Sequence, residues 1–497
     1  MLDYDAIIIG AGLGGLSAGA KLAKEGKKVL LIEQHTIPGG YATNFKRKDY
    51  VFDAGLHETS SFEATKAEKE IADALKIKEN LEFIKLPEFY HFTNGRFEIT
   101  IPDDTKKAIK VLTKRFPHEK EGIDKFFSII LAIQKEITKL PSGKKLYVSL
   151  PLFPILYPEL TFKSKKSLGE FLDSIIDDEE LKLILCANIG YYHNDPYQTS
   201  LVYYAVAQAT MFESGSYYIK GGSQNLSDYL TGVIKENGGK VLLGHITTGI
   251  ITKDNAATGV VYKKTNGSQI MTASAKTIIA NAAVPNISLM LPKRTRIPLE
   301  KKISKLKASP SLITIHMGFK KSPKELGNKY YSTFVFDPLL DSIKELGENL
   351  KGEFEKKGFS FVDYSQIDSG LGKPVGAICA IDSIDNWENL SDAQYKKKKD
   401  EVAKIFFARL EKIIPGISRE IELYEVATPK TLKRYTLNPG GSVYGFAQTP
   451  KQSGRFRFPN KSPVKNLYFA SAWGTPGGGF AAAIIGGYLC AKEVLRD

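Results

Sequence analysis

The sequence contains very little cysteine. Its 497 residues include three, Cys186, Cys379 and Cys490, which lie far apart and form no C-x-x-C pair. This spacing excludes a zinc finger, a redox dithiol and the disulfide framework of a small secreted domain. We expect each cysteine to be a small buried apolar residue, and we expect no metal site.

Long hydrophobic runs are also lacking. No apolar stretch of the sequence approaches the ~18 residues needed to span a bilayer, and no charged segment followed by an apolar one opens the chain. The first apolar run starts at Asp5, which leaves no room for a leader. We therefore expect a cytoplasmic protein that is either soluble or peripheral on the inner face of the membrane.

The chain is basic, with a net charge of +14, but it carries no nucleic-acid-binding motif and its lysines are scattered. We therefore expect no nucleic-acid partner. Attraction to an anionic membrane surface would account for the charge, and so would simple solubility. The two explanations are equally good at this point.

The strongest pattern lies in the first forty residues. Residues 5–10 form a short apolar run typical of a parallel strand buried on both faces. The motif G-x-G-x-x-G follows at residues 10–15 and opens an amphipathic helix that we expect over residues 13–25. Glycines at these positions permit a tight turn, close approach of backbone amides to a pyrophosphate, and close packing of helix on strand. The helix N-terminus would offer its unpaired N–H groups to the anion.

A second predicted strand, residues 28–33, ends in a carboxylate. Glu33 follows the glycine turn by roughly 20 residues, where an acid accepts hydrogen bonds from ribose hydroxyls, and Gly39 and Gly40 come next. A lone G-x-G-x-x-G is weak evidence, and a glycine-rich turn without a ligand is the alternative. Strand, helix, acid and second glycine pair together predict a dinucleotide site.

This extended pattern resembles the FAD-binding N-terminus of glutathione-reductase-like flavoproteins, and the Gly39-Gly40 pair favours FAD over NAD. The continuation through Asp53 and Gly55 to His57 is similar to the family of phytoene desaturases, carotenoid isomerases and retinol saturases. The resemblance implies an FAD-dependent oxidoreductase. Such an enzyme saturates, desaturates or isomerises carbon–carbon double bonds of a long lipophilic polyene such as a carotenoid, retinoid or unsaturated fatty acid.

The resemblance also implies an architecture. It covers roughly residues 1–60, 215–285 and 425–497, and a chain of 497 residues exceeds what one hydrophobic core usually organises. We expect an α/β protein with a Rossmann-like FAD domain of the glutathione-reductase type, formed by residues 1–85, 215–290 and 425–497. Residues 86–214 and 291–424 would form an inserted α+β substrate-binding domain.

Several cofactor contacts follow from the resemblance. The backbone of Ile246 would meet the adenine, and the helix that begins at Phe480 would point its N-terminus at the flavin. Relatives carry Gly-Asp before the tryptophan that corresponds to Trp473, whereas this chain has Ser471-Ala472, so one expected contact is missing. The cofactor-binding residues that we expect are Gly10, Gly12, Leu13, Gly14, Gly15, Glu33, Gln34, Gly39, Gly40, Tyr41, Ile246, Ser471, Gly478, Gly479 and Phe480.

Two residues are candidates for catalysis. We expect His57 to share one face of an extended segment with Asp53 and Gly55, because strand side chains alternate. On that face it would orient the substrate or transfer a proton; a structural histidine bonded to backbone is the alternative. Tyr444 lies in residues 428–445, which the family places over the substrate side of the flavin.

Two further stretches have a functional and an ordinary interpretation. The aromatic residues between 191 and 218 would line a substrate tunnel or simply fill a core. Residues 146–162 combine prolines, leucines and aromatics, and the lysines Lys163, Lys165 and Lys166 follow at once. That segment would dock on a membrane interface or lie between domains.

Other functions stay open at this stage. An amine-oxidase-like flavoenzyme shares the fold but would need an aromatic cage around the flavin. A non-catalytic escort protein that only holds FAD is a third possibility. No second G-x-G-x-x-G occurs between a strand and a helix, so we expect no separate NAD(P) domain, and the electron donor or acceptor remains open.

Overall fold

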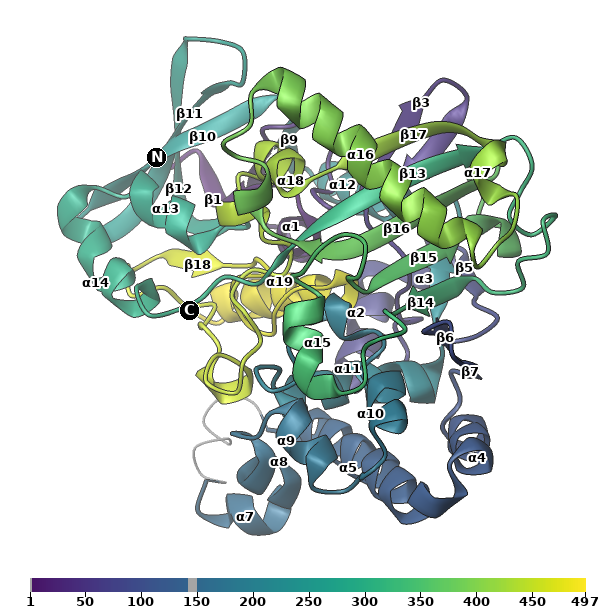
Figure 1. Ribbon diagram of the computed structural model, residues 1–497. Helices are drawn as coiled ribbons and strands as arrows, with labels where there is room; N and C mark the ends of the chain where they lie inside the picture. Colours follow the sequence, from purple (N-terminus) through teal and green to yellow (C-terminus); the bar gives the residue numbers. More distant parts are fainter. Residues whose placement is uncertain (1, 142–149) are drawn as a thin grey trace.

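The computed structural model describes residues 2–141 and 150–497. Two large sheets lie beside each other, and a group of helices extends below them (Figure 1). Both chain ends lie on the side of the first sheet. Of the proline-rich segment predicted at 146–162, residues 146–149 fall outside the described residues.

Among the described residues, the first sheet has seven strands in the order β10-β11-β12-β1-β2-β9, with β18 paired to β12. Alternate side chains of β1 enter two different cores, Ala6 and Ile8 one of them and Ile7 and Ile9 the other. This is why the strand is apolar without alternation, as parallel strands buried on both faces are. The parallel part consists of β1 (Tyr4–Ile9), β2 (Val29–Ile32), β9 (Lys240–Leu242), β18 (Leu467–Phe469) and the end of β12 (Ile270–Ala280). The antiparallel extension consists of β10 (His245–Lys253), β11 (Ala256–Lys264) and the start of β12.

Helices cover both faces of this sheet. One face carries α1 (Leu13–Lys24), α12 (Ser223–Glu236) and α19 (Phe480–Val494), and the other carries α13 (Val284–Met290) and α14 (Lys293–Ile303). The first and last of these helices touch closely. The Ser17 hydroxyl donates to the Ile484 carbonyl at 2.8 Å, and a Cβ on Gly487 would lie 2.0 Å from the Gly14 carbonyl oxygen. The contact brings together the two glycine-rich turns that precede α1 and α19.

The second sheet has the order β17-β13-β16-β15-β14-β6-β7 among the described strands. Its neighbours are antiparallel except β14 and β6, which run parallel. The helix α16 (Asp392–Glu411) crosses one face (Figure 1) and buries Val402, Phe406 and Leu410 there; α17 (Ile417–Glu420) follows it. The strands are β6 (Tyr90–Thr93), β7 (Glu98–Ile101), β13 (Ser311–Phe319), β14 (Ser332–Val335), β15 (Phe359–Asp363), β16 (Val375–Asp382) and β17 (Ile421–Ala427).

The helices at the bottom of Figure 1 come from the segment between β7 and β8 (Tyr217–Ile219) and share one aromatic-rich core. Both α7 and α8 carry proline in their first turn, where the missing N–H costs nothing. The described part of the predicted loop is therefore a 3-10 turn (Leu150–Leu152) followed by two short helices. The group comprises α4 (Thr105–Arg115), α5 (Lys120–Lys139), α7 (Phe153–Leu156), α8 (Pro158–Lys163), α9 (Leu168–Asp173), α10 (Glu179–Leu185) and α11 (Leu201–Ser214).

Smaller elements join these bodies. Strands β3 (Asn44–Arg47) and β4 (Tyr50–Asp53) form a hairpin that follows β2 in the chain. Strand β5 (Phe83–Lys85) pairs with β8. Among the described residues, the remaining helices of four residues or more are α2 (Lys66–Leu75), α3 (Ile77–Asn80), α15 (Ile343–Asn349) and α18 (Pro429–Thr436).

The parallel sheet with helices on both faces confirms the predicted Rossmann-like α/β fold. Strands β6 and β7 pair antiparallel across Asn94-Gly95, a dipeptide typical of hairpin turns. The first sheet takes its strands from three distant stretches of the chain, which hold β1–β2, β9–β12 and β18. The second sheet takes its strands from the two stretches between them, which hold β6–β7 and β13–β17. One strand of the second sheet, β17, runs through residue 425.

Candidate functional site

The first glycine turn packs tightly against Asn281 and Ala470 and leaves the N-terminus of α1 open. Gly10 has a φ of +96°, and a Cβ there would lie 2.6 Å from the Asn281 carbonyl oxygen. A Cβ on Gly12 would lie 2.7 Å from Asn281 Nδ2, and one on Gly14 would lie 1.7 Å from the Ala470 carbonyl oxygen. Within the described chain no side chain caps the N-terminus of α1. Its first N–H groups are therefore free to bind an anion.

The Glu33 carboxylate is fixed directly beside this turn. Its Oε2 accepts a hydrogen bond from the Ala11 amide at 2.7 Å, and its Oε1 accepts one from the His35 amide at 2.8 Å. Burial raises the pKa of this carboxyl, and the two amides act in the opposite direction by favouring the charged form. Each oxygen retains a lone pair, so the held carboxylate can accept further bonds from the hydroxyls of a ribose.

Backbone pairing places the other predicted cofactor residues around Glu33. The His245 amide donates to the Glu33 carbonyl at 2.8 Å, which puts Ile246 next to it on β10. The Gly39 amide donates to the Ala11 carbonyl, also at 2.8 Å. Gly40 has a φ of +64°, which favours glycine. The second glycine pair is thereby bridged to the first glycine turn.

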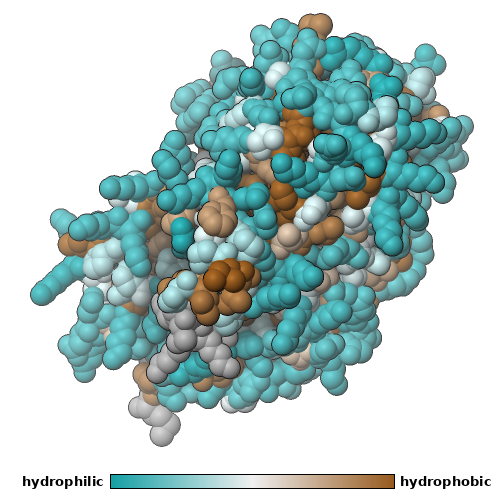
Figure 2. Space-filling view, turned by 90° about the horizontal axis from the view of Figure 1, so that it is seen from below, coloured by the Kyte–Doolittle hydropathy of each residue, from teal (hydrophilic) through white to brown (hydrophobic). Residues whose placement is uncertain are grey.

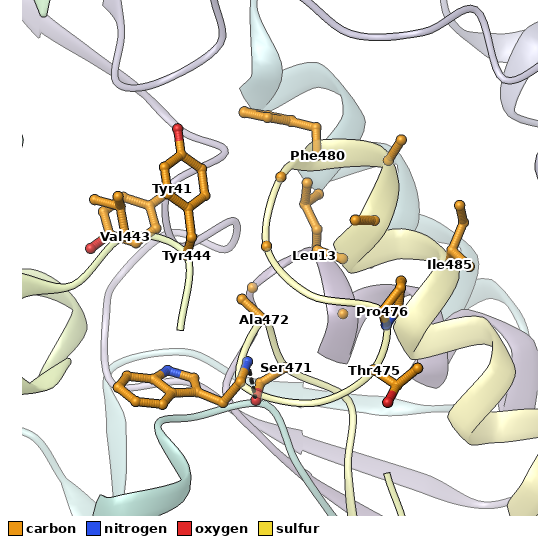
Figure 3. Close-up of a pocket in the computed structure, with 18 of the residues that line it drawn as sticks. Leu13, Tyr41, Val443, Tyr444, Ser471, Ala472, Thr475, Pro476, Phe480 and Ile485 are labelled. Atoms are coloured by element: carbon orange, nitrogen blue, oxygen red, sulfur yellow. Dashed lines mark hydrogen bonds between the residues drawn. The ribbon is translucent and has the colours of Figure 1, made fainter. Parts of the chain in front are cut away.

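The second glycine-rich turn, residues 471–479, leads into α19. Figure 3 shows this turn curling between Tyr41, Val443 and Tyr444 on one side and Leu13 and Phe480 on the other. The Ser471 hydroxyl accepts a hydrogen bond from the Trp473 amide at 3.3 Å, drawn as a dashed line. Its own hydrogen remains available to a ligand. Ser471 can thus supply one polar contact where the family pattern has an aspartate.

Arg457 holds this turn in place and was not predicted from the sequence. Its buried guanidinium donates to the carbonyls of Gly474, Phe446 and Ala472 at 3.0, 2.5 and 2.6 Å. Burial lowers the pKa of Arg457 to about 10, so it stays charged at neutral pH. One side chain therefore ties the loop before α19 to the loop that carries Tyr444. A single arginine without a motif gives no sequence signal for such a role.

The two glycine turns, Glu33 and Ile246 all line one cavity of about 1160 Å³. That volume exceeds the roughly 300–1,000 Å³ of ordinary ligand pockets, so a dinucleotide and a second molecule have room together. Gly15 does not line it; a Cβ there would lie 2.2 Å from the Gly10 carbonyl oxygen, which agrees with a packing role. The predicted site residues that do line it are Gly10, Gly12, Leu13, Gly14, Glu33, Gln34, Gly39, Gly40, Tyr41, His57, Ile246, Tyr444, Ser471, Gly478, Gly479 and Phe480.

His57 lies in the part of the cavity beyond the glycine turns. Its Nδ1 is 2.9 Å from the Tyr191 hydroxyl, and burial lowers the pKa of the imidazole to about 4, which keeps it neutral at pH 7. The prediction that Asp53 shares its face is wrong. The strand ends at Asp53, whose Oδ1 accepts bonds from the Gly55 and Leu56 amides at 3.0 and 2.8 Å. This turn redirects the chain and keeps Asp53 buried outside the cavity.

The far part of the cavity has apolar walls from four helices of the lower group. The aromatic residues predicted at 191–218 divide between the two interpretations: Tyr191, Tyr192 and Tyr203 line the cavity, whereas Tyr204 and Tyr218 are buried in the cores. The apolar residues of α5, α7, α8 and α11 that line it include Ile137, Phe153, Pro154, Leu160, Val202, Val206 and Met211.

The residues present fit FAD. Two uncapped glycine turns face one cavity, a held carboxylate stands at the ribose position, and the Thr247 hydroxyl, next to Ile246, is buried with no partner among the described residues. A Cβ at Gly479 would meet no atom within 4 Å, so open space lies before α19. Asn281 was missed as a site residue; its position at the end of a strand returning to the first glycine turn was the available signal.

Comparison with known proteins places the chain in a family. The model of the flavin containing amine oxidoreductases matches residues 13–495. The chain is 31% identical to prolycopene isomerase 2, chloroplastic, of an Oncidium hybrid cultivar, over 100% of this chain and 84% of that protein. It is 26% identical to all-trans-retinol 13,14-reductase of Danio rerio, over 99% of this chain and 86% of that protein. Among solved structures, putrescine oxidase superposes with a TM-score of 0.66 at 16% identity, covering 100% of each chain, which shows the fold.

The chain belongs to the flavin containing amine oxidoreductase family. The suspected relationship to carotenoid isomerases and retinol saturases is confirmed by these relatives. The protein is an oxidoreductase and its cofactor is FAD, as the sequence predicted.

Proposed function

We propose that the protein acts on carbon–carbon double bonds of a long lipophilic polyene. The observation that carries this proposal is the continuity of the cavity: the space beside both glycine turns runs on between apolar walls of α5, α7, α8 and α11. Apolar surfaces bind an apolar chain at about 0.8 kcal/mol per buried methylene, so few polar contacts are needed. The two relatives, a prolycopene isomerase and an all-trans-retinol 13,14-reductase, are named for substrates of this kind.

The residues predicted as cofactor ligands would each bind a different part of FAD. The turn at Gly10, Gly12 and Gly14 would hold the pyrophosphate, Glu33 the ribose, and the start of α19 the flavin. Bound FAD supplies hydride transfer. The protein would contribute orientation and exclusion of water through the tyrosines and aliphatic side chains that line the cavity.

His57 and Tyr444 would act on the substrate side. Both line the cavity, and the neutral imidazole of His57 is hydrogen-bonded to the Tyr191 hydroxyl at 2.9 Å, which would fix the orientation of the ring. A residue outside the cavity lining fixes the Tyr444 backbone, since the Tyr444 amide donates to Ser309 Oγ at 3.0 Å.

We also propose that the substrate enters from a membrane surface. Leu152, Ile155, Leu156 and Phe162 are 54%, 77%, 51% and 68% exposed, and their neighbours Phe153, Pro154 and Leu160 line the cavity. Figure 2 looks at the molecule from this side and shows apolar atoms gathered among polar ones. Lys163, Lys165 and Lys166 follow directly, which suits anionic headgroups.

A peripheral position fits the other observations. Within residues 2–141 and 150–497 no helix is long and apolar enough to cross a bilayer. We propose that the protein is cytoplasmic and associates with the inner membrane face through this exposed apolar segment, residues 150–166. The basic charge of +14 would add long-range attraction to anionic lipid.

We propose two domains, each built around one of the two large sheets. Residues 1–85, 215–290 and 425–497 contain every described strand of the first sheet, and this part would be the FAD domain. Residues 86–214 and 291–424 would be the substrate-binding domain. Because β17 ends at Ala427, the last boundary fits better just after that strand.

Flavin absorbance tests the proposal against both alternatives. Purified protein that carries oxidised FAD, and in a parallel set FAD reduced with dithionite, is mixed anaerobically with a polyene, with a small amine, or with buffer, and the oxidised-flavin band is followed. Loss of the oxidised band, its recovery in the reduced set, or a binding-induced spectral change with the polyene alone supports the proposal. Bleaching with the amine alone supports an amine oxidase, and a flavin that responds to neither points to an escort.

A further inference from the structure

Arg457 is a buried positive charge without a negative partner. The residue is 5% exposed, and no carboxylate of the described residues forms an ion pair with its guanidinium. The hydrogen bonds that it donates all go to backbone carbonyls. Carbonyls are neutral, so they satisfy its N–H groups and leave its charge uncompensated. Because a buried charge is costly unless an opposite charge lies near it, we expect an anion close to Arg457 in the working protein.

The guanidinium lies directly behind the second glycine-rich turn. Its Nη2 donates to the Ala472 carbonyl at 2.6 Å and to the Tyr444 carbonyl at 3.5 Å. Both of these residues line the cavity, whereas Arg457 itself does not. A Cβ on Gly477 would lie 3.6 Å from the same nitrogen. Only a layer of backbone therefore separates the positive charge from the cavity beside this turn.

Neutral side chains complete the surroundings of this charge. The Tyr203 hydroxyl donates to the Gly478 carbonyl at 3.0 Å, and the Gln448 amide group donates to the Pro476 carbonyl at 3.2 Å. Tyr203 is the titratable side chain whose charge would act on Arg457. Burial raises the pKa of Tyr203 and that of Tyr444, so both phenols are uncharged at neutral pH. Neither of them cancels the charge of the guanidinium.

We propose that Arg457 is a positioning residue whose positive charge stabilises the reduced, anionic flavin and thereby raises the reduction potential of the bound FAD. This inference rests on the proposed position of the flavin ring at the start of α19. Two electrons, from dithionite or from a substrate, and one proton from water convert the neutral oxidised ring into a reduced ring with one negative charge. A nearby cation therefore binds the reduced state more tightly than the oxidised state.

The start of α19 would act in the same direction but with less charge. In the part of the chain that the structure covers, no side chain caps this helix, so its first N–H groups are open. A helix N-terminus is equivalent to roughly half a positive charge, whereas the guanidinium carries a whole one. Salt and water screen a buried charge much less than an exposed one. Arg457 should therefore account for a measurable part of the potential.

The midpoint potential of the bound FAD tests this role. It is measured on purified FAD-loaded protein by anaerobic titration with dithionite against a reference dye. At a fixed ambient potential, Arg457→Gln should lower the ratio of reduced to oxidised flavin by about tenfold or more, a fall of about 30 mV for a two-electron couple. Arg457→Lys keeps the charge and should keep most of the potential. Lys451→Gln removes an exposed charge from the same loop and should leave the potential unchanged.

The pH dependence of the potential separates the effect of charge from that of shape. The potential falls by about 30 mV per pH unit when one proton accompanies two electrons, and by about 59 mV when two protons do. The plot therefore has a break at the pH where the reduced ring takes up its second proton. Arg457→Gln should move this break to higher pH, because without the cation the reduced ring binds that proton more readily. A side chain that only shaped the turn would leave the break in place.

The result that would overturn the inference is an Arg457→Gln variant with bound FAD whose potential and break are unchanged. Equal losses of affinity for oxidised and reduced FAD would also overturn it, because the charge would then act on the pyrophosphate. If the variant does not load FAD, the unmodified protein decides. Its break should lie at lower pH than that of free FAD in the same buffer, and a break at the same or higher pH would overturn the inference. The titration uses no polyene, so each of these failures leaves the proposed function standing.

Discussion

The Nδ1 atom of His57 and the hydroxyl of Tyr191 are 2.9 Å apart, and both residues line the cavity beyond the glycine turns. The two come from parts of the chain that are 134 positions apart. His57 follows the hairpin β3–β4, and Tyr191 precedes α11 in the lower helices. The contact therefore joins the region that would hold the flavin to the region that would hold the substrate.

Substitution of His57 tests its proposed part in turnover. His57→Gln should slow turnover about tenfold or more and leave the flavin spectrum intact, because the lost group would handle a proton of the substrate and would not hold FAD. Tyr191→Phe should also slow turnover. In the double variant the loss of rate should be smaller than the two single losses combined, because the pair acts together. Unchanged kinetics in His57→Gln would leave a structural histidine.

Glu33→Ala should weaken FAD retention by roughly one to two decades in affinity, as expected for loss of a hydrogen-bonded carboxylate. The same change also releases the amides of Ala11 and His35. Dialysis against FAD-free buffer followed by flavin absorbance measures the effect. Glu25→Ala, at the exposed end of α1, is the matched control and should keep its flavin. Equal retention in both variants would contradict the ribose role.

Gly14→Ala should destabilise the protein and prevent FAD loading. A Cβ at this position would lie 1.7 Å from the Ala470 carbonyl oxygen, which is backbone and cannot move aside. The free energy of unfolding should fall by about 1 to 3 kcal/mol or more. Gly232→Ala, within α12, is the control, since its Cβ would meet only Glu236 Oε1 at 3.8 Å. That variant should be more stable by about 0.5 to 1 kcal/mol. Similar thermal stability of the two variants would argue against close packing of the first turn.

Membrane binding is expected to depend on the exposed apolar segment. Ile155→Ser should reduce co-sedimentation with anionic liposomes, while Leu339→Ser should not, although the two side chains are 77% and 78% exposed. Added salt should weaken the binding of the unmodified protein, because screening shortens the reach of its lysines. Loss of binding in neither variant, or in both, would contradict docking through residues 150–166.

Stability should depend on pH through Glu58. Its folded pKa of about 8 lies above its ordinary value of 4.5, so its contribution to stability is complete below about pH 4.5 and is lost as the pH rises through about 8. Glu58→Gln carries no titrating group and should lose less stability than the unmodified protein between about pH 6 and pH 9. Thermal unfolding across that range measures the difference. Parallel pH profiles would show that Glu58 is ionised in the folded state.

Local signals in the sequence were sufficient for the nucleotide half of the cavity. Turns that need glycine, a buried apolar strand and an acid at a set distance are all encoded within short stretches, so Gly10 to Gly40 could be interpreted in order. The antiparallel pairing of β6 and β7 was equally local, because Asn94-Gly95 is a strong turn signal. These features depend on neighbours in sequence.

The substrate half depends on tertiary contacts and could be predicted only in part. Arg457 acts on three distant carbonyls and carries no motif. Alternation placed Asp53 beside His57, but the carboxylate instead binds the two amides that follow it and ends the strand. Glu58 attracted no attention in the sequence, because a single glutamate is ordinarily a surface residue and its neighbours Glu88, Asp103 and Ser216 come from later parts of the chain.

The central claim is that the flavin chemistry of this protein takes place on a polyene, and product analysis tests it most directly. FAD-loaded protein, in one set with oxidised flavin and in another with flavin reduced by dithionite, is incubated with polyenes and, separately, with small amines, and the products are identified by mass and by chromatographic retention. We predict a polyene product that gains or loses a pair of hydrogens, or that keeps its mass and changes its retention, and that fails to form when FAD is removed. Polyenes recovered unchanged, together with oxidation of an amine, would contradict the account.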